Sequence, residues 1–319
     1  MAHHSSNTAS SLATVTELPV KKAELTVKKG HSLWSDGWKR LKRNKAAVIS
    51  LAFIVFVCVI AILAPWIAPY SFETQDIDRA LMPLDAKNLL GTDSLGRDML
   101  SRIIYGARMS MAVGIFTAVF SLLIGGLYGA VSGWMGGWVD SILMRIIDIL
   151  YAIPSLVLLI LVGVVFNSMN LFSNPELKAL TGIFLALSVV GWVSLARLVR
   201  GQVLQVREML YVEGARALGA SDWRIVGKHI LPNILGPVIV MLTFQIPSNI
   251  LFESFLSFIG LGLQPPYSSW GVLANDGWRA KSYPHLILFP GIALFCTMLA
   301  FNLLGDGLRD AFDPKMKNR

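Results

Sequence analysis

Residues 46–65 read AAVISLAFIVFVCVIAILAP, a stretch with no charged side chain. An α-helix rises about 1.5 Å per residue, so roughly 20 such residues are enough to cross the roughly 30 Å hydrocarbon core of a bilayer. A mostly polar segment comes first, which places the stretch too far into the chain for the apolar core of a secretory signal. It therefore predicts a transmembrane helix.

Five further apolar stretches follow, and together they predict six spans, at about 46–68, 110–132, 146–166, 180–198, 235–258 and 286–305. The composition agrees, because 54% of the 319 residues are hydrophobic and only 15% are charged, against about 25% charged in soluble domains. We expect an all-α polytopic membrane protein. Gly125, Gly129 and Gly133 recur every fourth residue in the second span, which predicts one helix face that packs closely on a neighbour.

Lysine and arginine set the expected orientation. If the N-terminus lies inside and the six spans alternate, 20 of the 28 basic residues fall in inner segments and 8 in outer segments. By the positive-inside rule, both termini and the loop 199–232 are expected in the cytoplasm, and the loop 70–109 on the opposite side of the membrane. The net charge of +8 is explained by this asymmetry, and it gives no reason to expect nucleic acid as a partner.

The residues before the first span divide into two parts. Residues 1–30 are polar and rich in Ser, Thr and Lys, which predicts a disordered cytoplasmic tail. In residues 31–45, Trp34, Trp38 and Leu41 follow helical spacing among basic residues, which predicts an amphipathic helix at the inner membrane interface, in contact with lipid. Residues 46–316 then form the six-helix domain.

Several kinds of chemistry are missing from the sequence. It contains no G-x-x-x-x-G-K-[ST] phosphate loop, no H-E-x-x-H and no G-x-S-x-G. All five histidines lie outside the predicted spans or at their edges, and Cys58 and Cys296 lie alone inside apolar stretches. We therefore expect no catalytic residue, no metal site and no cofactor in this chain. Energy for any transport must come from a partner or from an ion gradient.

The loop between the fourth and fifth spans carries the most specific signal. Residues 211–224 read YVEGARALGASDWR, and residues 228–233 read KHILPN. The first part predicts a short helix over 211–218 that ends at Gly219, since glycine readily adopts the left-handed conformation that follows a helix. Ser221 or Asp222 is then suited to begin a second short helix. Two short helices rich in Ala and Leu suit docking into a groove on a partner.

This loop resembles the signature E-A-A-x-x-x-G-x(9)-I-x-L-P of importer permeases of the ATP-binding-cassette class. Glu213, Ala215, Gly219, Leu231 and Pro232 match it, while Gly214 replaces the first Ala and His229 the Ile. The resemblance implies a coupling segment that docks on an ATPase subunit. The residues that it assigns to coupling are Glu213, Gly214, Ala215, Leu218, Gly219, Ala220 and Asp222.

Three further stretches resemble the peptide and nickel branch of this family, and most of all the C-type permease subunit of oligopeptide importers. GTDSLGRD at 91–98 is similar to the branch segment G-T-D-x-x-G-R-D, and 250–258, 264–271 and 305–315 also match. The outer-loop site residues are then Gly91, Thr92, Asp93, Gly96, Arg97 and Asp98.

Charge spacing suggests two local structures. Residues 94–105 predict a short amphipathic helix on the outer surface that leads into the second span and either braces the substrate entrance or caps the helices. Its signals are the i,i+4 pairs Asp93/Arg97 and Asp98/Arg102 and the stripe of Leu95, Met99 and Ile103. Arg145 and Asp148, spaced i,i+3, predict an ion pair at the inner end of the third span.

The fifth span has a polar face. Gln245, Asn249 and Glu253 recur every fourth residue and so share one side of a helix. Because a charged group deep in a bilayer costs on the order of 2.5–3.5 kcal/mol, this side should face other helices or a wet cavity. The three residues either line the transport pathway or hydrogen-bond to neighbouring helices, and the sequence leaves both interpretations open.

The resemblance implies a type I importer permease fold and a definite set of partners. These are a homologous B-type permease, two cytoplasmic ATPases of the D and F types that bind ATP and Mg²⁺, and an extracytoplasmic binding protein. The chain would form half of a pathway for peptides, with oligopeptides as the first cargo expected and dipeptides or nickel chelates as alternatives. A proton-coupled secondary transporter is the alternative from another class. It would need an essential intramembrane carboxylate and no ATPase.

Overall fold

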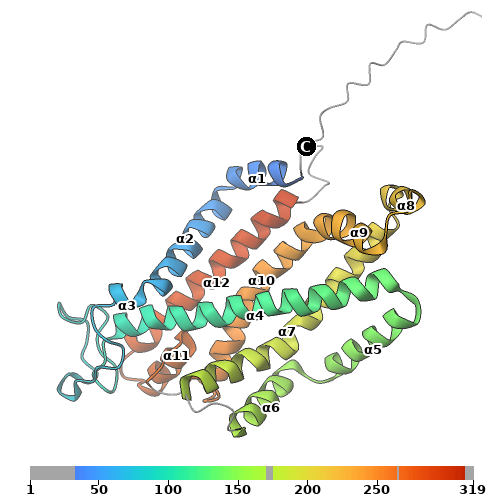
Figure 1. Ribbon diagram of the computed structural model, residues 1–319. Coiled ribbons are helices and arrows are strands. Elements are labelled where there is room, and N and C mark those ends of the chain that lie inside the picture. Colours follow the sequence, from blue (N-terminus) through green and yellow to red (C-terminus); the bar gives the residue numbers. More distant parts are fainter. Residues whose placement is uncertain (1–32, 170–174, 264–265, 313–319) are drawn as a thin grey trace, which may run out of the picture. The chain divides into compact units, whose positions relative to one another are not determined.

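The computed structural model describes residues 33–169, 175–263 and 266–312 (Figure 1). Within these ranges the regular elements are all helices, and the only β-type pairing is an isolated bridge between Thr92 and Asp98. The predicted tail over residues 1–30 lies outside the described residues. The all-α prediction is confirmed for the part of the chain that is described.

Five helical segments in the part of the chain that the structure describes are long and apolar enough to cross a membrane. They are α2 (Lys45–Ile62), α4 (Met99–Met135), most of α7 (Pro175–Arg207), α10 (Leu231–Phe258) together with the two turns before it, and α12 (His285–Phe312). Each contains one of the predicted apolar stretches or most of it. The 37-residue α4 and the 33-residue α7 run well beyond the predicted spans.

The third predicted span is not one straight helix. Residues 146–166 fall across α5 (Gly137–Ala152) and α6 (Ser155–Ser168), which meet at an angle of 88°. Pro154 lacks an N–H group and disfavours a helical backbone in the residue before it, and Ile153 is accordingly extended at φ −90° and ψ 127°. The described residues therefore contain six candidate spans only if this bent pair counts as one.

Short helices occupy the connections between the long ones. α1 (Leu33–Arg43) precedes α2, and Asn44 between them accepts a hydrogen bond from the Ala47 N–H at 3.2 Å and so caps α2. After α2 come α3 (Ala64–Ile67) and the 3₁₀ turn η1 (Ile77–Arg79), and α11 (Trp270–Arg279) lies between α10 and α12. The helix expected over residues 31–45 is thus present from Leu33.

The glycine face predicted in the second span packs against α7. A Cβ atom on Gly125 would lie 2.5 Å from the Trp192 carbonyl oxygen, and one on Gly129 would lie 2.3 Å from that of Ala196. No side chain fits at these distances, so the two helix backbones are in direct contact. The prediction of close packing is confirmed, and the structure identifies the partner helix.

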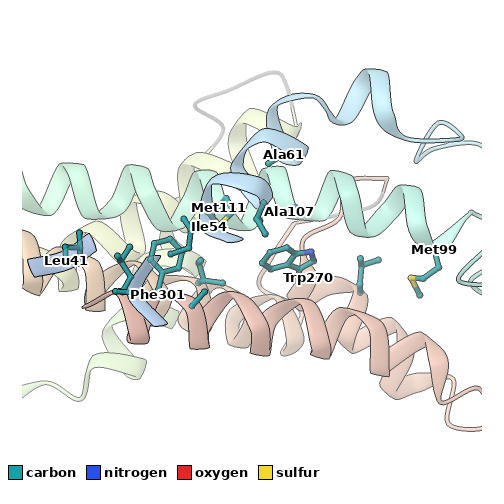
Figure 2. Close-up of a cluster of buried hydrophobic side chains, with 14 of the residues drawn as sticks. Leu41, Ile54, Ala61, Met99, Ala107, Met111, Trp270 and Phe301 are labelled. Atoms are coloured by element: carbon teal, nitrogen blue, oxygen red, sulfur yellow. The ribbon is translucent and has the colours of Figure 1, made fainter. Parts of the chain in front are cut away.

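Buried side chains join α1, α2, α4, α11 and α12 in one cluster (Figure 2). Trp270 of α11 lies within it, and its indole Nε1 donates a hydrogen bond to the Ile103 carbonyl oxygen of α4 at 3.1 Å. A second cluster holds Val212, Ile225 and Ile230 against α7 and α10. In Figure 1, α1, the end of α12 and the short helices α8 (Leu210–Ala217) and α9 (Asp222–Ile225) lie toward one end of the long helices, and α11 with the loop before α4 lies toward the other.

Candidate functional site

The segment between α7 and α10 forms a projecting pair of short helices, which we call the α8–α9 knob (residues 210–225). α8 (Leu210–Ala217) ends just before Gly219, where φ is +79°. No atom lies within 4 Å of a Cβ built on Gly219, so the requirement for glycine here is conformational and not steric. α9 (Asp222–Ile225) follows, with Ser221 extended at its N-terminus, and continues through the π-helical turn η2 (Val226–Ile230) into α10. The predicted helix–glycine–helix arrangement is confirmed.

The knob has an anchored side and an exposed side. Val212 and Ile225 are fully buried and hold it to α7 and α10. On the other side Leu210, Leu218 and Trp223 are 84%, 90% and 82% exposed. Large apolar side chains exposed this far are typical of surfaces that bind another protein.

The residues assigned to coupling lie mostly on the exposed side. Glu213, Gly214, Leu218, Gly219 and Asp222 are exposed, and Ala215 and Ala220 are half-buried. The sequence pattern did not identify Arg216, whose guanidinium carbon lies 5.2 Å from the centre of the Trp134 ring at the end of α4. This cation–π contact joins the knob to the end of α4.

A compact turn, not a helix, holds the outer-loop residues. The predicted helix over 94–105 is confirmed only for residues 99–105, which are the first turns of α4 and not a separate short helix, because residues 94–98 form a tight turn in which φ of Gly96 is +70°. A Cβ on Gly96 would lie 1.7 Å from the Asp76 carbonyl oxygen. Gly91, with φ +78°, precedes the buried Thr92, whose hydroxyl accepts from the Met82 N–H at 2.9 Å.

Buried charges join this turn to α4 and α11. The Asp93 carboxylate accepts from Arg97 Nε at 2.7 Å and from Arg102 Nη1 at 2.5 Å, and Arg102 also lies 3.3 Å from Asp276 of α11. Both arginines are almost fully buried. The Asp93/Arg97 pair was predicted, whereas Asp276 comes from a distant part of the chain and carries no local signal.

The predicted Asp98/Arg102 pair is wrong. Asp98 caps α4, accepting from the Ser101 N–H at 2.8 Å and from the Asn88 side chain at 2.9 Å.

Elsewhere in the same loop, the Asp85 carboxylate accepts a hydrogen bond from the Asn88 N–H and lies beside Arg79. Both interactions favour the charged carboxylate and so lower the pKa of Asp85.

The polar face of α10 is turned toward α4 and α7. Gln245 Nε2 donates to Ser121 Oγ at 3.0 Å and to the Gly191 carbonyl oxygen at 2.8 Å, and Asn249 Nδ2 donates to the Gly114 carbonyl oxygen at 3.3 Å. Both side chains are buried. In this conformation these residues connect helices, and their role in lining a pathway stays a prediction that requires α10 to separate from its neighbours.

Glu253 is fully buried among serine hydroxyls. Its carboxylate accepts from Ser257 Oγ at 2.8 Å and from Ser110 Oγ at 3.2 Å, and Ser110 in turn accepts the Trp270 N–H of α11 at 3.2 Å. Gly271 lets α11 approach closely, since a Cβ there would lie 2.4 Å from Ser254 Cα. Glu253 thus connects α10, α4 and the N-terminus of α11.

Ion pairs at the other end of the helices join α5 to α7. The predicted Arg145/Asp148 pair is wrong in its partner, because Asp148 pairs with Arg197 at 2.6 Å. The sequence also gave no sign of the Asp140–Arg200 pair at 2.6 Å. Arg207 donates to the Trp134 carbonyl oxygen at 2.9 Å, near the end of α4. Among the described residues no cluster of three or more His, Cys, Asp or Glu side chains could hold a metal ion.

Comparison with known proteins gives consistent matches over nearly the whole chain. Residues 125–318 match the family described as binding-protein-dependent transport system inner membrane component, and residues 32–83 match the N-terminal transmembrane domain of oligopeptide transport permease C. The dipeptide transport system permease protein DppC of Bacillus subtilis is 43% identical over 90% of this chain and 87% of that protein.

Two further relatives are named for the transport of other substrates. The oligopeptide transport system permease protein OppC of Escherichia coli K12 is 44% identical over 90% of this chain and 92% of its own length. The glutathione transport system permease protein GsiD of Pectobacterium atrosepticum is 39% identical over 89% of this chain and 92% of its own length. Identities this similar do not distinguish between the three cargoes.

Proposed function

This chain belongs to the permease subunits of ATP-binding-cassette peptide importers of the inner membrane, and from this membership we propose that it forms half of a peptide pathway and couples that pathway to partner ATPases through the α8–α9 knob. The exposed apolar tip of the knob carries the proposal. Leu218 and Trp223 are over 80% exposed, on a segment held firmly to the spanning helices by Val212 and Ile225. A rigidly mounted apolar tip suits the transfer of a partner's movement to α7 and α10.

The proposed assembly has the type I importer fold, with both termini and the knob in the cytoplasm. Its other members are a homologous B-type permease, two ATPases of the D and F types and an extracytoplasmic binding protein. ATP and Mg²⁺ bind to the ATPases, and this chain itself holds no cofactor. ATP and the loaded binding protein shift the population between inward-open and outward-open states.

We propose oligopeptides as cargo, with dipeptides and glutathione as the alternatives that relatives' names suggest. Growth on defined peptides of two to six residues as the sole amino-acid source, compared between the wild type and a strain lacking this gene, distinguishes these cargoes. Loss of growth on the short peptides alone would reject the oligopeptide assignment.

Co-purification tests the coupling role. We expect the tagged chain to retain two ATPase subunits, and Leu218→Asp to lose them while it still inserts in the membrane, because a carboxylate at the tip must be desolvated on docking. Leu89→Asp, at an exposed apolar position of the outer loop, is the matched control. Retention of the ATPases by Leu218→Asp would reject the docking assignment, and uptake that persists without ATP and stops with a proton ionophore would favour a secondary transporter.

A further inference from the structure

An apolar cavity of about 360 Å³ opens beneath α1, where α1 meets α10 and the end of α12. We call it the α1 cavity, and its lining residues are Gly37, Trp38, Leu41, Ile239, Leu308, Ala311 and Phe312. Its volume is at the lower end of the range for pockets that hold small molecules. A Cβ on Gly37 would lie 3.1 Å from the Phe312 ring, so α1 sits directly on the end of α12 and forms a fixed wall of the cavity.

Cations border this cavity. The Lys42 ammonium lies 5.4 Å from the centre of the Trp38 ring, one helical turn along α1. With 3.6 residues per turn, Lys39 lies on the same flank of the helix, and Lys39, Lys42 and Arg43 are all exposed. Within the described residues none of these three has a carboxylate within ion-pair distance. In the sequence, the acidic residues close to the lining positions are Asp36, Asp306, Asp310 and Asp313, fewer than the five basic residues at positions 39–45.

We propose that the α1 cavity binds an anionic phospholipid of the cytoplasmic leaflet, with an acyl chain in the cavity and the headgroup phosphate on Lys42 and Lys39. An apolar cavity alone would suit any lipid, and exposed cations alone would suit any anion. The two occur together at the start of the first span, where a headgroup and its chain lie one above the other. Basic pockets between membrane helices on the cytoplasmic side bind anionic lipids in this way. The proposal rests on the cytoplasmic placement of α1 given above.

Fluorescence quenching by brominated lipids tests this proposal, because Trp38 lines the cavity. The complete importer is placed in nanodiscs that contain an increasing mole fraction of either dibromo-phosphatidylglycerol or dibromo-phosphatidylcholine, over the same range for both lipids. The signal of Trp38 is the difference between wild type and Trp38→Phe. Both leaflets of a nanodisc have the same lipid composition, so the outcome does not depend on the orientation of the chain. We expect Trp38 quenching to require several-fold less phosphatidylglycerol than phosphatidylcholine.

Three variants make the test specific. Lys42→Gln should reduce the preference for phosphatidylglycerol about fivefold, the effect of one cation near an anionic surface. Lys281→Gln should leave it unchanged, because Lys281 forms the comparable contact with Trp278, 5.7 Å from that ring, away from the cavity. Ile239→Phe should reduce quenching by filling the cavity while leaving every charge in place.

The contrary outcomes are equally definite. Equal quenching by the two lipids would overturn the proposal, as would an equal effect of Lys281→Gln, which would indicate general surface attraction. Unchanged quenching by phosphatidylglycerol in Ile239→Phe would show that no acyl chain enters the cavity. If deletion of residues 313–319 raised quenching by both lipids equally, the C-terminal segment and not a lipid would be the occupant.

Discussion

A single backbone angle sets the direction of the α8–α9 knob. Gly219 has φ +79° and no neighbours that a side chain would meet. Valine resists this conformation because its branched Cβ crowds the backbone there, whereas asparagine tolerates it. We predict that Gly219→Val inserts and assembles, but that the importer containing it hydrolyses ATP without transporting peptide. An importer with Gly219→Asn should transport nearly as well as wild type. Parallel assays of ATP hydrolysis and uptake in proteoliposomes measure both. Wild-type transport by Gly219→Val would show that the turn has no part in coupling.

Glu253 gives a second prediction at a single residue. Its carboxylate connects Ser257 and Ser110, and through Ser110 the start of α11. Glu253→Gln keeps the length and the oxygen acceptor, so we expect it to keep most of the wild-type melting temperature. Glu253→Leu leaves buried hydroxyls without a partner, and each costs about 1–3 kcal/mol. Thermal unfolding of the purified protein should therefore give Glu253→Leu a clearly lower melting temperature than Glu253→Gln. Equal melting temperatures would mean that the hydrogen bonds of these hydroxyls do not stabilise the protein.

For single residues, the sequence predicted which side of a helix a side chain occupies, but not which residues it contacts. The spacing of Gln245, Asn249 and Glu253 was enough to place them on one side of a helix, and all three are buried there. The partners of Gln245 lie on α7 and α4, 54 residues away for Gly191 and 124 for Ser121, and Glu253 accepts from Ser110 of α4, 143 residues away. Arg102 shows the same limit, because local spacing suggested Asp98, while the fold supplies Asp93 and Asp276.

Among the elements, the contact between α4 and α7 allows a matched test. A Cβ on Gly129 would lie 2.3 Å from the Ala196 carbonyl oxygen, whereas one on Gly126 would meet nothing closer than 3.8 Å. Both glycines are in the same helix, so alanine raises helix propensity equally at the two sites. We predict that Gly129→Ala lowers stability by about 1–3 kcal/mol through overpacking and that Gly126→Ala does not. Urea or thermal unfolding of the two variants measures the difference. Similar stabilities would show that α4 and α7 can move apart to accommodate the added Cβ without loss of stability.

Cysteine scanning of α10 tests whether its polar face ever meets water. In a variant without Cys58 and Cys296, we predict slow reaction of a charged thiol reagent at positions 245, 249 and 253 in the resting importer, because all three are buried. If this face lines the pathway, addition of ATP and binding protein should accelerate labelling at these positions. Ser248 is the matched control, since it lies on the exposed side of the same helix. Labelling that stays slow under every condition would limit the three residues to a structural role.

The course of the helices was predictable, but their interruptions were not. Apolar content was enough to predict five of the six stretches, each of which lies within a long helix. The reason is that a helix needs about 20 consecutive apolar residues to cross a bilayer, and such a stretch is visible in the sequence. The break at Ile153 and Pro154 leaves the apolar content unchanged, so the third stretch looked continuous. The α8–α9 knob was predictable for the opposite reason, since its geometry depends on a local glycine turn.

At the scale of the whole molecule, membership of the importer family was the most secure result of the sequence. Motifs at 91–98, 211–233 and 250–258 each depend on local chemistry, and they indicated the same branch from separate parts of the chain. Cargo was not predictable, because relatives named for dipeptides, oligopeptides and glutathione are 39–44% identical to this chain.

The buried Arg102 also has a consequence for biogenesis. Its first partner, Asp93, is nine residues away, but its second, Asp276, is separated from it by 174 residues. At about 5–20 residues per second, the ribosome needs roughly 9 to 35 s to supply the second carboxylate. During that interval Arg102 is paired with Asp93 alone, and its contact with α11 forms only after most of the chain has been synthesised. The end of the molecule where α4 begins is therefore completed near the end of its synthesis.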